Sequence, residues 1–368
     1  MLTSMSLTDR EREIVALLRR DPLIGSEALA EALGTTRAAV NVHLSNLGKK
    51  GVILGRGYVL SEEPAVVVVG GANMDVKARS TRAAVPATSN PGTGSMAAGG
   101  VGRNIAENLA RLGTRTHLVA AIGSDGLGDQ VLAATSGAGV HVEHVRRSAR
   151  ATGTYTAVLD ADGELVVAVA DMAATDELSP EQVNAARDLV AAAGLVVLDG
   201  NLSTATLGFA LDLATTAGAR VLLEPVSVPK AGALAHLVDA DRPLFAITPN
   251  RDELAALTDQ PTRTDRQVQR AAQALHDRGV ELVWVRLGDR GSLLSSADGS
   301  TELSAVPAEV ADVTGAGDAM LAAFCHALLT GSDPAAAAAY GHAAAALTVA
   351  SPHTVRPDLT DRLVRSLL

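Results

Sequence analysis

The amino-acid sequence predicts an α/β protein: a three-layer sandwich with a small β lid, preceded by a small helical domain. From residue 65 onward, apolar strand-like runs alternate with amphipathic helical segments, which is typical of a sheet covered by helices on both faces. The strand-like, turn-rich segments 76–98 and 152–170 interrupt this alternation and predict the lid. The expected divisions are a helical domain at 1–60, a linker at 61–65 and an α/β domain at 66–368.

Composition places the chain among folded globular proteins. Its 368 residues are 47% hydrophobic, which suits one large domain and one small one. The single cysteine, Cys325, excludes an internal disulfide framework and suits a reducing cytoplasm. Charged residues occupy 9–13, where a signal peptide would be apolar, and the apolar stretch 335–350 is too short and interrupted to span a membrane. We therefore expect a cytoplasmic protein with no membrane partner, and a packed Ala-rich helix at 335–350.

The first sixty residues predict three short helices followed by a hairpin. Thr8 begins the first helix, Asp21-Pro22 ends it, and Thr36 caps the third. Residues 51–60 predict a short two-stranded wing. This order of elements resembles the winged helix-turn-helix domains of small bacterial regulators.

That resemblance implies DNA as a partner of the N-terminal domain. Arg37, Asn41 and Lys49 lie on the outward face of the third helix, where such side chains reach base edges or phosphates, and Arg56 of the wing is expected at the DNA backbone. The net charge of −10 argues against broad binding of nucleic acid, but residues 1–60 carry +2 while the rest carries −12. A helical module that serves only for dimerisation is the alternative.

The rest of the chain predicts a doubly wound sheet, in which ligands bind at the carboxyl ends of the strands. The first strand is the apolar run at 65–69. The later strands are expected at 116–121, 195–199, 220–224, 244–248 and 281–286, and the helices at 103–112, 125–138, 180–193, 203–217, 264–278 and 315–330.

The most informative segment is 312–318, a glycine-rich turn followed by an acid and a helix. Gly315, Ala316 and Gly317 would lie at the helix N-terminus, where unpaired backbone N–H groups and the helix dipole favour phosphate. The Asp318 carboxylate beside them can take the proton of an attacking hydroxyl. By itself, the segment is equally consistent with a glycine turn that caps a helix and a solvated acid.

A second cluster follows the first strand. Asn73 and Asp75 come directly after it, and Gly99, Gly100 and Asn104 open the next helix. Glycines permit close backbone approach, and Asn and Asp side chains can pair with sugar hydroxyls. A dinucleotide site is the rival interpretation, but the glycines are misplaced for it.

Two weaker motifs follow later strands. Asn250 and Glu253 are three residues apart on one helix face, and can orient Mg²⁺ waters or simply form a helix cap. Gly288 and Gly291 form a tight turn where a nucleotide can lie, although an ordinary β-turn has the same pattern.

Together these segments resemble the ribokinase-like (PfkB) carbohydrate kinases over nearly all of residues 65–368, with 312–318 and 99–104 as the two signatures. The resemblance implies a ribokinase-like sandwich that transfers a phosphoryl group from ATP to a sugar hydroxymethyl group with the help of Mg²⁺. It implies Asp318 as general base and the amides of Gly315, Ala316 and Gly317 as the anion hole.

The same resemblance implies the binding residues. The acceptor sugar would contact Asn73, Asp75, Gly99, Gly100 and Asn104, while ATP and Mg²⁺ would contact Asn250, Glu253, Gly288, Gly291, Thr314 and His342, with Glu253 reaching Mg²⁺ through water. Asp312 lies where the family often binds K⁺. His141, His144 and His326 show no metal-ligand spacing and are expected to be structural or surface residues.

Within the family, residues 89–92, 99–110 and 313–320 look like those of bacterial pseudouridine kinases, some of which carry an N-terminal helix-turn-helix. A pocket selective for pseudouridine needs an acceptor for the extra ring N–H. The candidates are Asp171, at the end of the second lid segment, and Tyr155 or Thr154 on the lid, although each is equally consistent with a solvated lid residue. Glu224 replaces a more usual Asp, which leaves the geometry near the phosphates open.

Two other functions stay open at this point. One is a kinase for another nucleoside or a free sugar, and the other is a transcriptional regulator whose kinase-like domain only senses a ligand. Because lid sheets in this family often pair between subunits, a homodimer is expected.

Overall fold

The computed structural model describes residues 7–55 and 64–368. The chain divides into two compact units, residues 1–63 and 64–368. The second half of the predicted wing, including Arg56, and most of the predicted linker lie outside the described residues, so the expected domain limits stay predictions. None of the described helices is long and apolar enough to cross a membrane.

The N-terminal unit is built from the three predicted helices, α1 (Asp9–Arg20), α2 (Ser26–Ala32) and α3 (Arg37–Lys49). Thr8 and Thr36 cap α1 and α3 with their hydroxyls, as expected. The apolar faces of the three helices form a small separate core around Ile14, Leu29 and Leu47, each of them fully buried. This unit therefore has its own hydrophobic centre.

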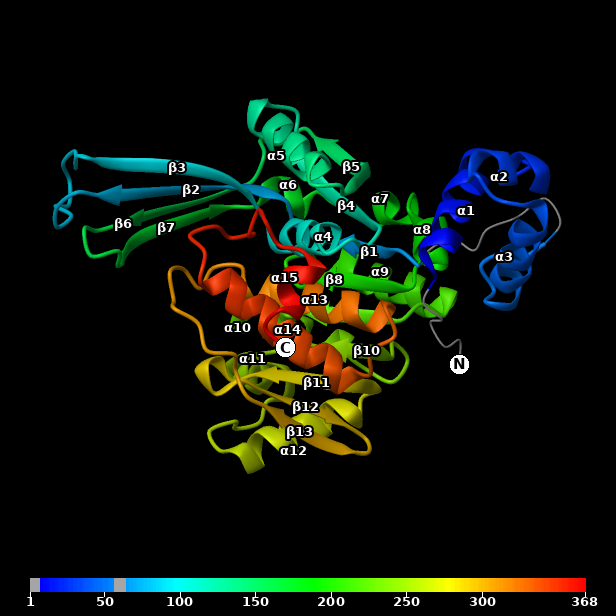
Figure 1. Cartoon of the computed structure of the whole chain (residues 1–368). Coiled ribbons are helices and arrows are strands. Elements are labelled where there is room, and N and C mark those ends of the chain that lie inside the picture. Colours follow the sequence, from blue (N-terminus) through cyan, green and yellow to red (C-terminus); the bar gives the residue numbers. More distant parts are fainter. Residues whose placement is uncertain (1–6, 56–63) are drawn as a thin grey trace. The chain divides into compact units, whose positions relative to one another are not determined.

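The C-terminal unit contains a nine-stranded sheet in the order β13-β12-β11-β10-β9-β8-β1-β4-β5 (Figure 1). The strands from β11 to β5 in this order are parallel, and β12 and β13 add an antiparallel edge. Their bounds are β1 Val66–Val69, β4 Thr116–Gly123, β5 His141–Ser148, β8 Leu195–Asp199, β9 Val221–Glu224, β10 Leu244–Ile247, β11 Val280–Arg286, β12 Ser292–Ser296 and β13 Gly299–Leu303.

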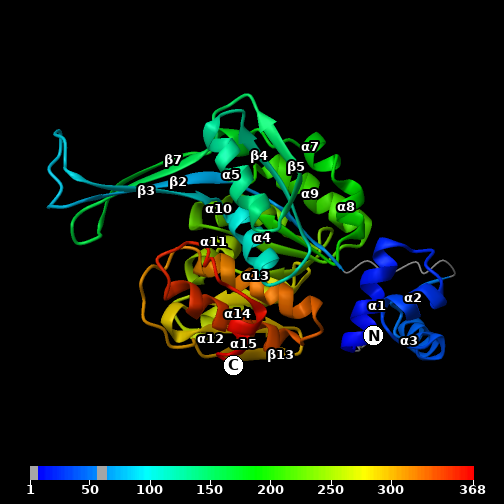
Figure 2. The same cartoon turned by 45° about the horizontal axis from the view of Figure 1, so that its top comes forward.

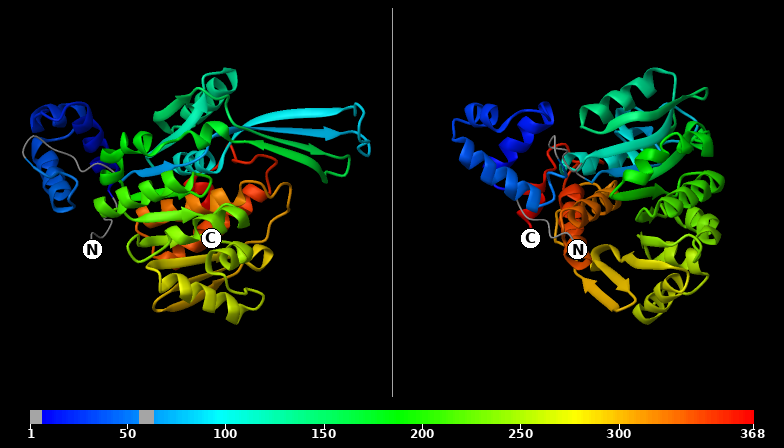
Figure 3. Two further views of the ribbon diagram at one scale, coloured as in Figure 1. Left: turned by 180° about the vertical axis from the view of Figure 1, so that it is seen from behind. Right: turned by 90° about the vertical axis from the view of Figure 1, so that its right-hand side faces the viewer.

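Helices cover both faces of this sheet, which confirms the predicted three-layer sandwich (Figure 3). One face packs against α4 (Val101–Arg111), α13 (Ala316–Leu329), α14 (Pro334–Val349) and α15 (Asp361–Arg365). The other packs against α7 (Pro180–Asn184), α8 (Arg187–Ala192), α9 (Thr204–Ala217), α10 (Val228–Leu234), α11 (Arg251–Thr258) and α12 (Asp265–His276). Since side chains of a strand alternate between faces, strands buried on both sides have the continuous apolar runs seen in the sequence.

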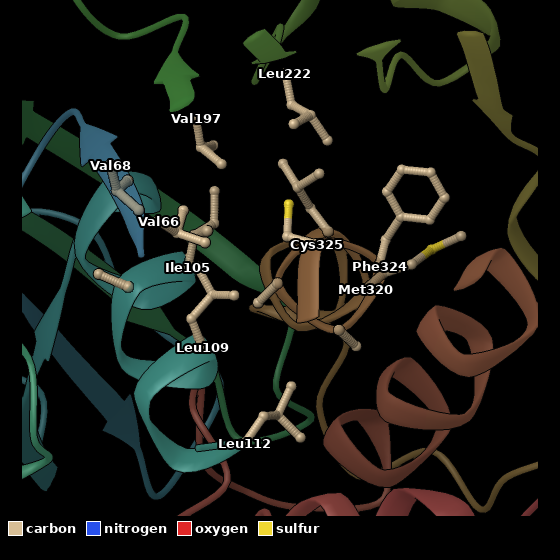
Figure 4. Close-up of a cluster of buried hydrophobic side chains, with 14 of the residues drawn as sticks. Val66, Val68, Ile105, Leu109, Leu112, Val197, Leu222, Met320, Phe324 and Cys325 are labelled. Atoms are coloured by element: carbon tan, nitrogen blue, oxygen red, sulfur yellow. The ribbon is translucent and has the colours of Figure 1, made fainter. Parts of the chain in front are cut away.

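Helix α13 lies at the centre of the first layer. Figure 4 shows Phe324 and Cys325 of α13 pointing toward the sheet, with Ile105 and Leu109 of α4 beside them. The Ala-rich α14 packs against the same helix, as the small side chains of both permit. The first turn of α13, which carries Gly317 and Asp318, is therefore anchored by a fully buried helix body.

The two lid segments form a separate four-stranded sheet, β3-β2-β6-β7, that extends away from the sandwich (Figures 1 and 2). Its strands are β2 Asn73–Ser80, β3 Gly92–Gly99, β6 Thr154–Leu159 and β7 Leu165–Asp171. Strands β2 and β6 pair in parallel at its centre. Because β2 begins four residues after β1 ends, the base of the lid lies at the carboxyl ends of the main strands.

The structure differs from the sequence prediction in two respects. The helix expected at 180–193 is two helices, α7 and α8, because Ala186 has ψ of 11° and interrupts the helical backbone. Strand β5, the short helix α6 (Ala173–Asp176) and the β12–β13 hairpin were not predicted. The helix expected at 125–138 is α5 (Gly126–Gly137).

Candidate active site

A pocket of about 280 Å³ opens at the base of the lid, at the carboxyl ends of β1 and β8. Separated parts of the chain form it, among them the β1–β2 turn, the start of α4, the lid strand β6 and the turn before α13. The pocket is lined by Gly71, Asn73, Asp75, Gly100, Val101, Asn104, Tyr155, Met172, Thr175, Asn201, Thr314, Gly315, Asp318 and Thr354. The two signature segments thus meet, although more than two hundred residues separate them.

Asp318 is the third residue of α13, and Asn104 of α4 holds its carboxylate. The Asn104 side-chain N–H donates to Asp318 Oδ2 at 2.9 Å. Arg103 in turn donates to the Asn104 oxygen at 2.9 Å, and Glu107 accepts from Arg103. This chain of bonds fixes which way the Asn104 amide faces and therefore where the carboxylate lies.

Burial raises the pKa of Asp318 to about 8. Glu224 and Asp199 add to this effect through charge repulsion, whereas the Asn104 hydrogen bond and the Arg286 charge act in the opposite direction. A carboxyl group with a pKa near neutral is a much better proton acceptor than an ordinary aspartate. The environment of Asp318 therefore suits a general base.

The turn before α13 has the geometry of an anion site. Gly315 has φ of 80°, and a side-chain carbon there would lie 2.0 Å from the Thr354 carbonyl oxygen, so only glycine fits. The Ala316 N–H makes only a long 3.3 Å bond to Val313. The first N–H groups of a helix have no acceptor one turn earlier, and they carry the positive end of its dipole.

The opposite wall of the pocket comes from the start of the lid and of α4. Asn73 donates to Asp75 Oδ1 at 2.7 Å, and burial raises the pKa of Asp75. A side-chain carbon at Gly99 would lie 2.3 Å from the Asp75 carboxylate, and one at Gly100 would lie 2.5 Å from the Gly71 carbonyl oxygen. These contacts explain the two glycines and leave polar side chains facing the pocket.

Asp199, at the end of β8, organises this wall from behind. Its Oδ2 accepts from the backbone N–H groups of Gly71 and Gly102, both at 2.9 Å. Its Oδ1 accepts from the Asn201 N–H, and Asn201 lines the pocket. Asp199 was not predicted as a site residue, although an acid at the carboxyl end of a predicted strand is a usable signal.

Asp312 lies at the start of the anion-site turn and already has a cationic partner. Its Oδ1 accepts from the backbone N–H and the hydroxyl of Thr314, which orients the turn. Its Oδ2 accepts from the Lys77 ammonium at 2.8 Å, so this ion pair joins lid strand β2 to the turn. An oxygen site of this kind suits K⁺ in chemistry, but K⁺ would have to compete with Lys77 there.

Arg286 forms a second charged cluster, at the ends of β9 and β11. Its Nη2 lies 2.7 Å from Glu224 Oε1 and 3.2 Å from Glu253 Oε2, and both acids are buried. A side-chain carbon at Gly317 would lie 2.5 Å from Arg286 Nη1, so the guanidinium is directly beside the anion-site turn. Arg286 was not predicted as a site residue, because it has no glycine or acid motif of its own.

Asn250 and Glu253 form the reciprocal helix cap that the sequence analysis weighed as the alternative. Asn250 caps α11, and its backbone N–H donates to Glu253 Oε2 at 2.8 Å. Burial raises the pKa of Glu253, and Arg286 opposes this. The carboxylate oxygens of Glu224 and Glu253 are the ligand type that Mg²⁺ prefers, so this pair fits Mg²⁺ in donor chemistry.

Several predicted residues lie apart from the pocket walls. Gly288 begins the short 3₁₀ turn η2 (Gly288–Arg290), and Gly291 follows it with φ of 94°. Asp171 is exposed at the end of β7.

His342 is also apart from the pocket walls. It is buried, and its Nε2 shares a 2.7 Å hydrogen bond with the Ser292 hydroxyl. Because the Trp284 indole also donates to Ser292, His342 belongs to a core network next to β12.

The outward face of α3 carries the residues predicted to contact DNA. Arg37, Asn41 and Lys49 are all exposed, and Arg37 Nε donates to the Ser26 hydroxyl at 3.2 Å. Lys50, by contrast, pairs with buried Glu11 at 2.7 Å and serves the fold of the unit. The exposed face is thus polar and basic.

Comparisons with known families and proteins agree with this arrangement. The model of the pfkB family of carbohydrate kinases matches residues 63–361, and the model of winged helix-turn-helix DNA-binding domains matches residues 7–53. Both parts of the resemblance predicted from the sequence are confirmed.

Individual relatives cover most of the chain. It is 36% identical to the uncharacterized sugar kinase YeiI of Escherichia coli K12, over 96% of this chain and 97% of that protein. It is 32% identical to a pseudouridine kinase of E. coli K12, over 84% of this chain and 98% of that protein. The structure of Arabidopsis thaliana ribokinase complexed with ribose and ATP matches with a TM-score of 0.73 at 29% identity, over 83% of this chain and 99% of that one.

Proposed function

This chain belongs to the pfkB family of carbohydrate kinases, and we propose that it transfers the γ-phosphoryl group of ATP to the 5′-hydroxyl of pseudouridine. The observation that carries the proposal is the position of Asp318, which faces the pocket beside the anion-site turn and has a raised pKa. This is the arrangement that phosphoryl transfer to an alcohol requires.

In the proposed reaction, Asp318 accepts the proton of the 5′-hydroxyl as its oxygen attacks the γ-phosphorus. The new O–P bond forms while the bond from the γ-phosphorus to the β,γ-bridging oxygen breaks, and ADP leaves with that electron pair. The N–H groups of Gly315, Ala316 and Gly317 stabilise the charge on the transferred group. Arg286, next to Gly317, adds a fixed positive charge at the same place.

ATP and its metal would lie on the Arg286 side of the turn. Glu253, with Glu224 nearby, would hold Mg²⁺ through water, and Mg²⁺ when bound shields the charge of the phosphates. Contacts of ATP with Thr314, Gly288, Gly291 and His342 stay predictions. K⁺ beside Asp312 also stays a prediction, because Lys77 occupies one oxygen of that carboxylate.

The acceptor is proposed to bind between Asp75 and the lid. Asn73, Asp75 and Asn104 face the pocket and suit ribose hydroxyls, and Tyr155 of β6 lines the pocket from the lid side. Asp171 pairs with Thr154 at the end of β7 and directly precedes Met172, which lines the pocket, so Asp171 stays a candidate for contact with the base. The 32% identical pseudouridine kinase is the main support for pseudouridine.

A second acceptor class has support of its own. The relative with 36% identity is described as a sugar kinase, so a free sugar is the alternative substrate. A panel of pseudouridine, uridine, other nucleosides, ribose and other free sugars, with phosphorylated product measured by mass spectrometry, separates the two. Preference for pseudouridine supports the proposal, equal turnover of uridine and ribose overturns the substrate, and product from none of them overturns the kinase activity.

We also propose that the N-terminal unit binds DNA through α3. The support is the family match at 7–53 and the exposed Arg37, Asn41 and Lys49. In gel-shift titrations, Lys49→Ala is expected to weaken binding on every sequence and to reduce the salt slope by about 1, as loss of one phosphate contact does. Binding that is unchanged in Lys49→Ala and Arg37→Ala would contradict this role and favour the dimerisation module.

A homodimer formed by the lid completes the proposal. Both outer strands of the lid are largely exposed, including the apolar Met96, Leu165, Val167 and Val169, each more than half exposed. Exposed apolar patches of this kind mark association surfaces. Val167→Asp/Val169→Asp is expected to shift the mass measured by light scattering from dimer to monomer, and a monomeric wild type would refute the dimer.

A further inference from the structure

Two histidines and a glutamate gather at the amino ends of β4 and β5, at the opposite end of these strands from the candidate active site. His117 of β4 and His141 of β5 are register partners on neighbouring strands, and Glu143 follows His141 by two residues. One potential ligand atom from each of the three side chains lies within 4.8 Å of those from the other two. The proposed kinase chemistry uses none of them.

His117 is the buried member of the cluster, and its polar atoms have no partner. Its side chain is 7% exposed, and neither ring nitrogen has a hydrogen-bond partner in the described part of the chain. Buried polar groups are nearly always paired, so two unpaired imidazole nitrogens indicate an unseen partner such as an ion. The ring stacks on that of His141 with centroids 4.5 Å apart, which keeps the two imidazoles together.

The donor atoms of the cluster suit a cation. Each histidine offers a ring nitrogen, and Glu143 offers a carboxylate oxygen. Histidine is the commonest metal ligand among protein side chains and binds through the lone pair of a ring nitrogen.

We propose that His117, His141 and Glu143 bind a divalent transition-metal cation, with Zn²⁺ as the best match. Two imidazoles and a carboxylate form a Zn²⁺ ligand set with one position left for water, whereas Mg²⁺ and Ca²⁺ prefer all-oxygen sites. His141 Nδ1 and Glu143 Oε1 are already 3.5 Å apart, close to the roughly 3.3 Å between ligands of a tetrahedral ion with metal–ligand bonds of about 2 Å. Both side chains are exposed enough to rotate toward His117.

The expected effect of the cation is structural. Strand β5 is the edge of the nine-stranded sheet, and a metal held by β4 and β5 together would clamp this edge. A cation that binds the folded chain and not the unfolded one raises thermal stability. Because the cluster lies at the other end of the strands from Asp318, kinase activity is expected to be unaffected.

The test uses the metal-free full chain without nucleotide. Calorimetric titration with ZnCl₂ is expected to show one saturable site per chain, and titration with MgCl₂ is expected to show none of comparable affinity. His141→Ala and Glu143→Gln should each weaken Zn²⁺ binding at least about tenfold, since even the loss of an outer partner of a metal ligand costs that much. His236→Ala removes an exposed histidine elsewhere and should leave the affinity unchanged.

Folding is checked separately, because a variant of the cluster can lose binding by unfolding. His141 and Glu143 are exposed, so thermal midpoints in the presence of a chelator should match the wild type. Addition of Zn²⁺ should raise the midpoint of the wild type and not that of His141→Ala. Absence of saturable Zn²⁺ binding in the wild type, or wild-type affinity in both ligand variants, would overturn the proposal.

Discussion

The side-chain amide of Asn104 donates a 2.9 Å hydrogen bond to Oδ2 of Asp318, across 214 residues of sequence. This bond joins the helix that opens with the first glycine signature to the helix that opens with the second. It also opposes the effect of burial, because it stabilises the ionised form of a carboxyl group whose pKa burial raises to about 8. Asn104 therefore helps to determine both the position and the protonation of the proposed base.

The first prediction concerns the pH dependence of the reaction. With a pKa of about 8, Asp318 of the free protein is mostly protonated at pH 7 and cannot accept a proton. The kcat/KM for the acceptor should therefore rise with pH and level off above about pH 8. Asn104→Ala removes a bond that lowers this pKa, so the rise should move to higher pH, while Asn184→Ala at an exposed site should not move it. A rise centred near pH 4, or no shift in Asn104→Ala, would contradict the assignment.

The second prediction concerns stability and follows from the same carboxyl group. Its pKa is 3.8 in a model peptide and about 8 in the folded protein, so the unfolded chain releases this proton first. Ionisation of Asp318 therefore destabilises the fold increasingly as pH rises from about 4 to about 8. Asp318→Asn cannot ionise and should be more stable at pH 8 by about 2–4 kcal/mol, with a smaller gain at pH 5. Urea unfolding at the two pH values measures this, and an equal gain at both would exclude the mechanism.

The third prediction concerns the ion pair between Lys77 and Asp312. Because the Lys77 ammonium neutralises Asp312, the wild type should respond only weakly to K⁺. Lys77→Met frees the carboxylate, so kcat at low K⁺ should fall and added K⁺ should restore much of it. Lys77→Arg keeps the charge and serves as the control. An unchanged K⁺ response in Lys77→Met would show that the lysine does not act as the cation of this turn.

The fourth prediction concerns Arg286. Arg286→Met leaves Glu224 and Glu253 buried without their cationic partner, so the free energy of unfolding at pH 7 should fall by about 3–5 kcal/mol. Burial already raises the pKa of Glu253, and loss of Arg286 raises it further, so the deficit should shrink as pH falls. Arg290→Met removes only an exposed pair with Asp265 and should cost under about 1 kcal/mol. Equal losses in the two variants would contradict the role of the cluster.

Local patterns in the sequence predicted most of the framework. Continuous apolar runs identified β1 and β8, and the threonine caps identified α1 and α3, because these signals lie within a few residues of chain. The meeting of Asn73, Asn104 and Asp318 at one pocket was implied by the family resemblance of the two glycine signatures, and the pocket lies at the carboxyl ends of parallel strands, where ligands were expected.

Contacts between distant residues were not predictable in this way. Arg286, Lys77 and Asp199 each have partners that lie between 33 and 235 residues away, and no local spacing marks such pairs. Glu224, in place of the Asp that is more usual in the family, indicated that the geometry near the ATP phosphates could differ from that of relatives. Only the structure shows that Arg286 is the partner of Glu224. His117 and His141 likewise meet only because β4 and β5 are neighbours in the sheet.

Asp318 is proposed as the general base of phosphoryl transfer, and a single assay can decide whether it has this role. Wild type and Asp318→Asn are incubated with ATP, Mg²⁺ and pseudouridine, and phosphorylated nucleoside is measured by mass spectrometry while circular dichroism confirms that both are folded. The wild type should form product, and Asp318→Asn should form it about 10²–10⁴-fold more slowly. A folded Asp318→Asn protein that forms product at the wild-type rate would contradict this role.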